Sequence, residues 1–221
     1  MKTKPYYAIF TLCISFLVTF AVQAVEISVK LTDIDKKPVA DLVVYLVPLE
    51  EQNLENLTPT SLMINQTDKK FNPYISVILK GMPVIFNNED DITHQVYSTS
   101  TSNRFSFRIK SERTKSIEPL KNTGKILMGC NIHDWMSGYL LVLNTPLYTK
   151  TDHQGVAKFD VKQTGRYTLS VWHPQLLAEN QTISQNINIQ SSDIYNISLS
   201  NKLADIPNQE NPESFDFLDD Y

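Results

Sequence analysis

The sequence predicts an all-β protein built from two β-sandwiches. Almost no stretch has the periodicity of an amphipathic helix, whereas apolar and polar residues alternate along many short segments. The clearest alternation runs through residues 25–31, 167–171 and 186–190. Turn-forming residues, such as Asp-Lys-Lys-Pro at 35–38 and Thr-Gly at 164–165, separate segments of this kind. Short alternating strands between turn signals are typical of sandwiches that bury one face of each sheet.

The first 24 residues predict a cleaved signal peptide rather than a part of the fold. Lys2 and Lys4 give a positive start, an apolar core spans residues 8–22, and Val-Gln-Ala at 22–24 is a small-residue cleavage signal. The mature chain is expected to begin at Val25 and to be periplasmic. The apolar core is too short to predict a stable membrane span, so the mature chain is expected to have none.

The charge of the chain argues against a nucleic-acid partner. Its formal net charge is −4, which becomes −6 once Lys2 and Lys4 leave with the signal peptide. No stretch forms a basic surface. Six acidic residues and a single lysine, Lys202, lie in the final segment 201–221, for which we predict an acidic disordered tail.

Cys130 is the only cysteine that the mature chain retains, because Cys13 lies within the signal peptide. A lone thiol in an oxidising compartment cannot form an internal disulfide and is open to oxidation. It is either buried as a small, inert hydrophobic side chain or engaged in function. Its neighbours in the sequence have to distinguish these two possibilities.

Three metal-binding side chains follow one another in the segment GCNIHDWMSG, residues 129–138. Cys130, His133 and Met136 have C-x2-H-x2-M spacing, and a tight turn between two strands can bring all three to one point. A thiolate, an imidazole and a thioether together favour copper over magnesium or calcium. His94, at the end of a neighbouring strand, would complete two histidines and a cysteine with a weak axial methionine, the arrangement of blue copper sites. A thioether can also fill a core, with a backbone carbonyl or nothing in the axial position.

The segment 59–145 resembles a cupredoxin of the amicyanin and plastocyanin kind. The resemblance is carried by the pattern G-x-x-V-x-F-x-N followed by H-x-V, and by the exit strand M-x-G-x-L-x-V, whose residues here are Gly81, Val84, Phe86, Asn88, His94, Val96, Met136, Gly138, Leu140 and Val142. It implies a Greek-key sandwich with one mononuclear type 1 copper held by His94, Cys130, His133 and Met136. It also implies that Asn88 ties the two ligand-bearing strands together by hydrogen bonds.

The flanking segments 25–58 and 146–200 resemble the strands of a small immunoglobulin-like or transthyretin-like sandwich, as found in carboxypeptidase regulatory-like domains. The matching features are P-V-x-x-x-x-V from Pro38, T-D-x-x-G from Thr151, and W-H-P from Trp172. This resemblance predicts one sandwich interrupted by an inserted cupredoxin, although a tandem arrangement of the strands is also open. The whole layout is similar to periplasmic cupredoxins of the methylamine utilization type, a label that names a genetic context and not a reaction.

The function that this resemblance implies is transfer of single electrons by a bound copper, without enzymatic activity. A multicopper oxidase or nitrite-reducing enzyme needs further histidines, and only His153 and His173 remain. A redox partner, for example a cytochrome or a dehydrogenase, would dock transiently near His133 and Trp135, with Ile132 adding apolar contact area.

Two other functions are compatible with the sequence. A module that stores, delivers or senses copper without passing electrons could have an identical set of ligands. Alternatively, the flanking sandwich could bind a carbohydrate or another protein, with Tyr148, Tyr167 and Trp172 as the aromatic side chains available for stacking on a sugar.

Overall fold

A computed structural model of the 221-residue chain describes residues 24–52 and 61–210. The described chain is made of strands and one short 3-10 helix, η1 (Glu179–Gln181), so the predicted all-β class is confirmed. The strands are β1 (Val25–Thr32), β2 (Val43–Pro48), β3 (Leu62–Thr67), β4 (Lys70–Asn72), β5 (Ile75–Leu79), β6 (Val84–Asn88), β7 (His94–Ser98), β8 (Ser106–Ile109), β9 (Thr114–Ile117), β10 (Gly124–Cys130), β11 (Ser137–Leu143), β12 (Tyr148–Lys150), β13 (Val156–Val161), β14 (Gly165–Trp172), β15 (Thr182–Ile189) and β16 (Asp193–Ser198).

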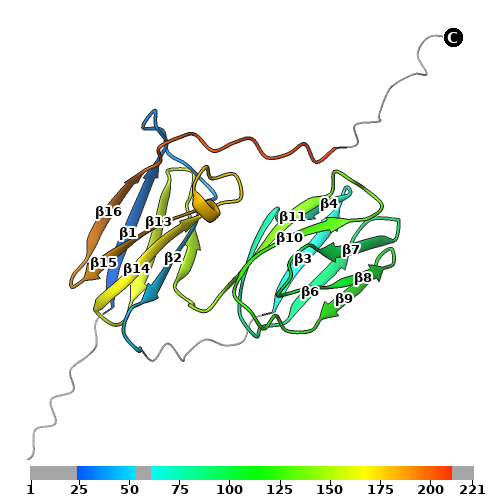
Figure 1. Ribbon diagram of the computed structural model, residues 1–221, viewed down its shortest axis with the longest axis horizontal. Helices are drawn as coiled ribbons and strands as arrows, with labels where there is room; N and C mark the ends of the chain where they lie inside the picture. The colour runs from blue at the N-terminus through cyan, green and yellow to red at the C-terminus, as the bar shows by residue number, and fades with distance from the viewer. Residues whose placement is uncertain (1–23, 53–60, 211–221) are drawn as a thin grey trace, which may run out of the picture.

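The strands form four sheets that pack as two sandwiches (Figure 1). The first, which we name the terminal sandwich, contains the sheets β13-β1-β16 and β12-β2-β14-β15. The second, the central sandwich, contains β5-β11-β10-β7-β8 and β4-β3-β6-β9. Strands on both sides of β3–β11 in the chain therefore pair with one another in the terminal sandwich.

Parts of three sequence predictions lie outside the described residues: the signal peptide up to residue 23, the boundary between residues 58 and 59, and residues 211–221 of the acidic segment. Within the ranges 24–52 and 61–210, no helix has the length and apolar character that a membrane crossing requires.

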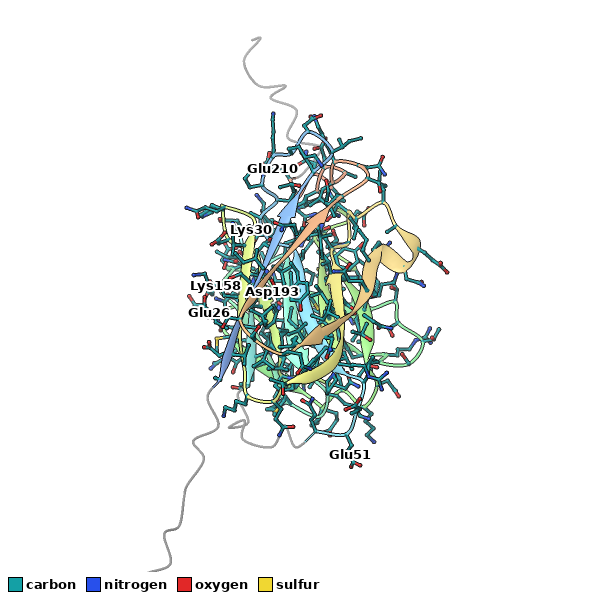
Figure 2. The ribbon with its side chains drawn as sticks, turned by 90° about the vertical axis from the view of Figure 1, so that its left-hand side faces the viewer. Glu26, Lys30, Glu51, Lys158, Asp193 and Glu210 are labelled. Carbon is teal, nitrogen blue, oxygen red and sulfur yellow. The ribbon has the colours of Figure 1, made fainter. Side chains whose placement is uncertain are left out.

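Alternation of side chains builds the terminal sandwich as the sequence predicts. In β1, Ile27, Val29 and Leu31 point into the core and are at most 1% exposed. Charged side chains occupy the outer face of the same sheet, where Glu26 and Lys30 of β1 flank Ser28, the residue that pairs with Lys158 of β13 (Figure 2). A period of two along a pleated strand sends successive side chains to opposite faces, which produces this division.

The turn between β12 and β13 requires glycine at position 155. One carboxylate oxygen of Asp152 accepts hydrogen bonds from the backbone N–H groups of Gln154 and Val156 at 2.8 and 2.9 Å. Gly155 has a φ of +71°, and a Cβ at this position would collide with the backbone oxygen of Leu31. Only glycine adopts this conformation without strain and also leaves room for the neighbouring strand.

The core of the central sandwich lies between its two sheets. The buried side chains from both sheets form one hydrophobic cluster, which includes Phe86, Val96, Met128, Cys130 and Met136. The thiol and the thioether of the predicted metal site are thus part of the hydrophobic core.

The two sandwiches also pack against each other. Val43 and Trp172 of the terminal sandwich contact Ile75, Leu141 and Leu143 of the central one. As a result β14 and β11 bury both of their faces, where a simple sandwich strand buries one.

Polar groups add to this contact between the sandwiches. Lys150 donates from Nζ to the backbone oxygen of Ile75 at 2.9 Å, and Gln175 donates from Nε2 to the hydroxyl of Tyr74 at 3.0 Å. The contact between the sandwiches therefore combines an apolar cluster with hydrogen bonds.

After β16 the chain runs from the terminal to the central sandwich as an extended segment, residues 199–210, which we name the strap (Figure 1). At its start Lys202 pairs with Asp35 at 2.6 Å. At its end Gln209 accepts from the backbone N–H of Ser137 at 3.3 Å and donates to the Ser137 hydroxyl at 3.1 Å. Residues 201–210, part of the segment with predicted disorder, form no strand or helix but make these contacts.

Truncation of Trp172 tests the contact between the sandwiches. This side chain is 2% exposed, so Trp172→Ala is expected to lower the free energy of unfolding by about 3–5 kcal/mol. Trp172→Phe is expected to cost much less, because the indole N–H has no hydrogen-bond partner among the described residues and its removal leaves no partner unpaired. Urea unfolding followed by circular dichroism measures the free energy of unfolding of both variants. A loss in Trp172→Phe as large as that in Trp172→Ala would contradict the burial of an unpaired indole N–H.

Candidate metal centre

Strand pairing brings two of the predicted ligands together. His94 is the first residue of β7, and Cys130 is the last residue of β10. These strands are antiparallel neighbours with Cys130 opposite Val96, so His94 and Cys130 lie at the same end of the sheet. Beyond the strands, the backbone N–H of Asn131 donates to the oxygen of Gln95 at 3.0 Å and continues the ladder.

The loop between β10 and β11 supplies the other two predicted ligands, His133 and Met136. The backbone N–H of Met136 donates to the oxygen of His133 at 3.0 Å, which closes a tight turn. The turn brings the His133 ring to 5.1 Å from the His94 ring, measured between centroids.

The donor atoms of His94, Cys130 and His133 converge on one point. Cys130 Sγ lies 3.6 Å from His94 Nδ1 and 3.8 Å from His133 Nδ1, and all three donor atoms are within 4.8 Å of one another. The three residues are buried, with exposures of 0% for His94, 3% for Cys130 and 7% for His133. The structure thus brings His94 of β7 together with Cys130 and His133 of the C-x2-H segment, as predicted from the sequence.

These distances fit a single metal ion. An ion with bonds of about 2.0–2.1 Å to nitrogen and about 2.3 Å to sulfur, at angles between tetrahedral and trigonal, separates the sulfur from each nitrogen by roughly 3.5–3.8 Å. The observed sulfur–nitrogen separations of 3.6 and 3.8 Å match this range. Two imidazoles and a thiolate suit copper or zinc and are unsuited to magnesium or calcium.

Met136 is buried in the same hydrophobic cluster as Cys130, with an exposure of 1%. Met128, the other methionine near the site in sequence, is 0% exposed and pairs with Ser98 in the β10–β7 ladder. Met136 as an axial ligand stays a prediction from the spacing and the resemblance.

Asp90 contacts the predicted ligand His94, a contact that the sequence predictions missed. His94 Nε2 lies 2.7 Å from Asp90 Oδ2, on the side of the ring opposite Cys130. A carboxylate four residues before a histidine is a signal that could have pointed to it, but the same segment also contains Glu89 and Asp91. Only the folded turn distinguishes Asp90 from these neighbours.

Asn88 makes different hydrogen bonds from those predicted. Its Nδ2 donates to the backbone oxygens of Ile92 at 2.7 Å and Ile109 at 3.3 Å, and its Oδ1 accepts from the N–H of Asp90 at 3.0 Å. These bonds hold the turn before His94 and the strand β8, so the prediction that Asn88 ties the His94 strand to the Cys130 strand is wrong. The side chain stands at the end of β6, whose neighbours β3 and β9 belong to the other sheet.

Hydrogen bonds in the site work against the effect of burial on the protonation of Cys130 and His94. Burial raises the pKa of the Cys130 thiol, but the hydrogen bond with His94 and those from backbone N–H groups lower it below its ordinary value. Burial lowers the pKa of His94, but the bonds to Cys130 and Asp90 outweigh it and the pKa is raised. Cys130 is thereby shifted toward the thiolate, the form in which sulfur binds metals.

His133 differs from His94 in its electrostatic surroundings. Burial lowers the pKa of His133, and the electrostatic effect of the nearby His94 lowers it further. A neutral imidazole is the form that binds a metal ion. Trp135, half-buried, lies beside His133 with ring centroids 5.1 Å apart, and Ile132 is 54% exposed. The loop therefore brings an apolar surface next to the ring of His133.

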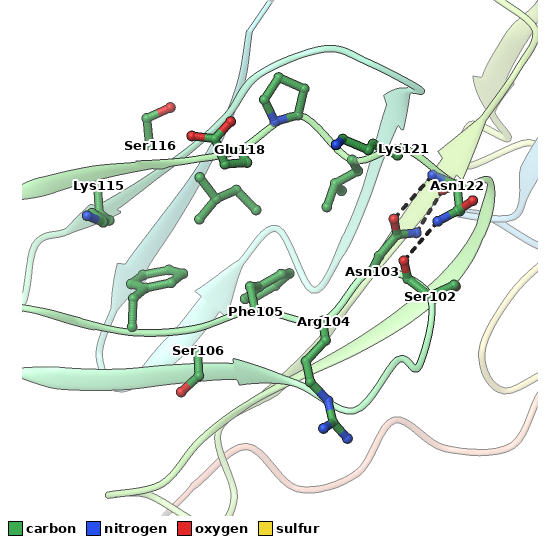
Figure 3. Close-up of a pocket in the computed structure, with 14 residues that line it drawn as sticks. Ser102, Asn103, Arg104, Phe105, Ser106, Lys115, Ser116, Glu118, Lys121 and Asn122 are labelled. Carbon is green, nitrogen blue, oxygen red and sulfur yellow. Dashed lines mark hydrogen bonds between the residues drawn. The ribbon is translucent and has the colours of Figure 1, made fainter.

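Two surface hollows lie on the central sandwich. One borders the candidate metal centre and is lined by Thr93, Gln95, Arg108, Asn131 and Ile132. The other, with a volume of about 510 Å³, opens between the edge strands β8 and β9 (Figure 3). Hydrogen bonds between Asn103 and Asn122 close its end, and no histidine or cysteine lines it.

Comparisons with known proteins find structural neighbours only. No protein-family model matches the chain, and no curated protein does. Among solved structures, a Cu-containing nitrite reductase from Thermus scotoductus is 20% identical, with a TM-score of 0.36 over 42% of this chain and 25% of that one. A purple cupredoxin from Nitrosopumilus maritimus is 17% identical (TM-score 0.34, 37% of this chain, 99% of that one), and an oxidised mutant of amicyanin is 16% identical (0.35, 40% and 88%).

The chain thus spans a quarter of the length of the nitrite reductase that it matches. Identities of 20% or less and TM-scores near 0.35 assign neither a family nor a function. The function has to be inferred from the side chains of this protein.

Removal of the Asn88 side chain tests the support of the turn before His94. Asn88 is 1% exposed, and Asn88→Ala leaves the buried groups that it bonds without partners. The expected loss in free energy of unfolding is about 2–4 kcal/mol, since each buried group left unpaired costs about 1–3 kcal/mol. Chemical denaturation measures this loss, with the half-buried neighbour variant Asn87→Ala as the control. A loss no larger than that of the control would contradict the role of Asn88.

Proposed function

We propose that this protein is a periplasmic type 1 copper protein that carries single electrons between redox partners. The observation that supports it is the convergence of His94 Nδ1, Cys130 Sγ and His133 Nδ1, three buried residues whose donor atoms lie within 4.8 Å of one another. We further propose that the central sandwich is a cupredoxin of the methylamine utilization type, inserted in a transthyretin-like sandwich. We also propose that the protein is exported through a cleaved signal peptide, which would place the thiol of Cys130 in an oxidising compartment.

The proposed ligands are His94, Cys130, His133 and Met136. Copper bound there supplies a one-electron couple between Cu(I) and Cu(II). The residues of the chain hold one arrangement for both states, because two ligands are fixed by the β7–β10 ladder and two by a short hydrogen-bonded loop. A site whose ligands move little between the two states can exchange electrons rapidly.

A partner would dock at the loop of residues 131–136. There Ile132 is exposed and Trp135 lies beside the ring of the proposed ligand His133. The hollow lined by Gln95 and Arg108 adjoins this surface. An apolar surface with polar groups at its margin suits small, transient contacts such as those between redox proteins, and we propose a periplasmic cytochrome or dehydrogenase as the partner class.

We propose no enzymatic activity for this site. A copper enzyme of the nitrite reductase kind needs a second metal centre built from further histidines. His153 is exposed in the turn between β12 and β13. His173 is buried after β14, where its Nδ1 accepts from the N–H of Gln175 at 3.2 Å.

Burial favours electron transfer over the rival function of copper delivery. A carrier has to release its ion to an acceptor that approaches the ligands, whereas His94 is fully buried and Cys130 is 3% exposed. Sugar binding by the terminal sandwich has little aromatic surface to use, because Tyr167 and Trp172 are 0% and 2% exposed and the half-buried Tyr148 packs against the apolar cluster between the sandwiches. Electron transfer is the function that the site supports best.

Visible and electron-spin spectra test the proposal. The mature chain, residues 25–221, is expected to bind one equivalent of Cu(II) with an intense blue or green thiolate-to-copper band. Cys130→Ser should remove this band, because its hydroxyl is a poor substitute for the thiolate. Reversible one-electron cycling distinguishes a shuttle from a carrier, which would instead give up Cu(I) readily to a chelator. A colourless copper complex of the wild type would contradict the proposal.

Exchange of methionines separates the axial ligand from an ordinary core residue. Met136→Leu keeps the volume of the side chain and removes the thioether, so the copper band should persist with a changed reduction potential, since the axial ligand tunes the potential of such sites. Met128→Leu, an equally buried control, should leave the potential unchanged. Cyclic voltammetry of the two variants measures the difference. Equal potentials in both variants would rule out Met136 as a ligand.

A further inference from the structure

Asp90 is a carboxylate next to the metal centre that the ligand set does not use. Its Oδ2 lies 2.7 Å from Nε2 of His94, a residue that is fully buried. The Asp90 side chain is itself only 11% exposed. Burying a carboxylate is costly unless the carboxylate is paired and hydrogen-bonded. The mostly buried position of Asp90 therefore depends on its contact with His94.

The surrounding turn fixes Asp90 in place. Its Oδ2 also accepts a hydrogen bond from the backbone N–H of Lys69 at 3.1 Å. The N–H of Asp90 donates to Asn88 Oδ1 at 3.0 Å, and its backbone oxygen accepts from the Ser111 hydroxyl at 2.9 Å. Three separate segments of the central sandwich therefore hold this one residue.

The chemistry of the pair determines which nitrogen of His94 carries the proton. An ionised carboxylate only accepts hydrogen bonds, and a neutral imidazole carries a proton on one nitrogen. With the proton on Nε2 facing Asp90, the lone pair of Nδ1 points toward Cys130 Sγ, 3.6 Å away. Carboxylates in this position set the tautomer and ring orientation of metal-binding histidines and raise their basicity.

We propose that Asp90 is a positioning residue that locks His94 in its metal-binding tautomer and, through its negative charge, stabilises Cu(II) relative to Cu(I). The second part rests on the proposed copper function, and the first does not. The charge acts at short range in a mostly buried site, where it is screened weakly. Asp90 thereby lowers the reduction potential of the centre.

Two substitutions separate the hydrogen bond from the charge. Asp90→Asn keeps the shape of the side chain and one oxygen that can accept hydrogen bonds from His94 and Lys69, but it removes the charge. Asp90→Ala removes both. Asp91→Asn is the matched control, because it removes the same charge from the next, exposed residue of the same turn.

The tautomer is read in the metal-free protein by nitrogen-15 NMR of histidine, at a pH where the ring is neutral and with His94→Gln to assign the signal. The wild type, Asp90→Asn and Asp91→Asn are expected to show the proton on Nε2. Asp90→Ala is expected to show a mixture of tautomers. Because no copper is present, this measurement decides the positioning role even if the proposed function fails.

Copper titration and voltammetry read the charge. Asp90→Ala should bind Cu(II) about 10–100-fold more weakly. Asp90→Asn should raise the reduction potential, by about 59 mV for each tenfold loss of Cu(II) affinity relative to Cu(I). Asp91→Asn should change it far less.

Three results would overturn the inference. The first is an Asp90→Ala protein that keeps the wild-type tautomer, Cu(II) affinity and potential. The second is an equal shift of potential in Asp90→Asn and Asp91→Asn, which would show a general effect of surface charge. The third is an Asp90→Asn protein with lower stability and an unchanged potential, which would show a purely structural role. A wild type that binds no copper would overturn the proposed function, and the tautomers would still decide the role of Asp90.

Discussion

The antiparallel pairing of β7 with β10 places His94 and Cys130 at the same end of neighbouring strands, and the rest of the site is arranged around that pair. Side chains alternate between the two faces of a sheet, so a slip of one residue in this register would send the thiol to the opposite face. The hydrogen bond from Asn131 to Gln95 extends the pairing past the last strand residue. The loop that follows therefore starts from a fixed position, and it returns His133 to the sulfur.

The site is built into the hydrophobic core rather than added to the surface of the fold. Cys130 and Met136 belong to the same buried cluster as Phe86 and Val96. Polar groups in such surroundings need partners, and the imidazole of His94 has one on each side, Cys130 and Asp90. Packing and hydrogen bonding hold the same few atoms, which makes the geometry of the three donors resistant to change.

Much of this was predictable from the sequence, and the parts that were not share a physical cause. The strands of the terminal sandwich follow from local alternation, as in β1, and the grouping of Cys130 with His133 follows from spacing within one loop. His94 required a resemblance, because the pairing that brings it to Cys130 spans 36 residues. Asp90 could not be separated from Glu89 and Asp91, since only the turn held by Asn88 decides which carboxylate faces inward. The contacts between the two sandwiches could not be predicted from the sequence either. Alternation in β14 predicts that one face of the strand is buried, but it does not show which surface covers the other face.

The strap joins the two sandwiches at a second place, away from the apolar contact around Trp172. It leaves the terminal sandwich beside Asp35 and ends on Ser137, directly after Met136. Two attachments at separate points oppose a swivel of one sandwich on the other. Through the hydrogen bonds of Gln209 to Ser137, a displacement of one sandwich relative to the other would be transmitted to the residue that follows the loop carrying His133.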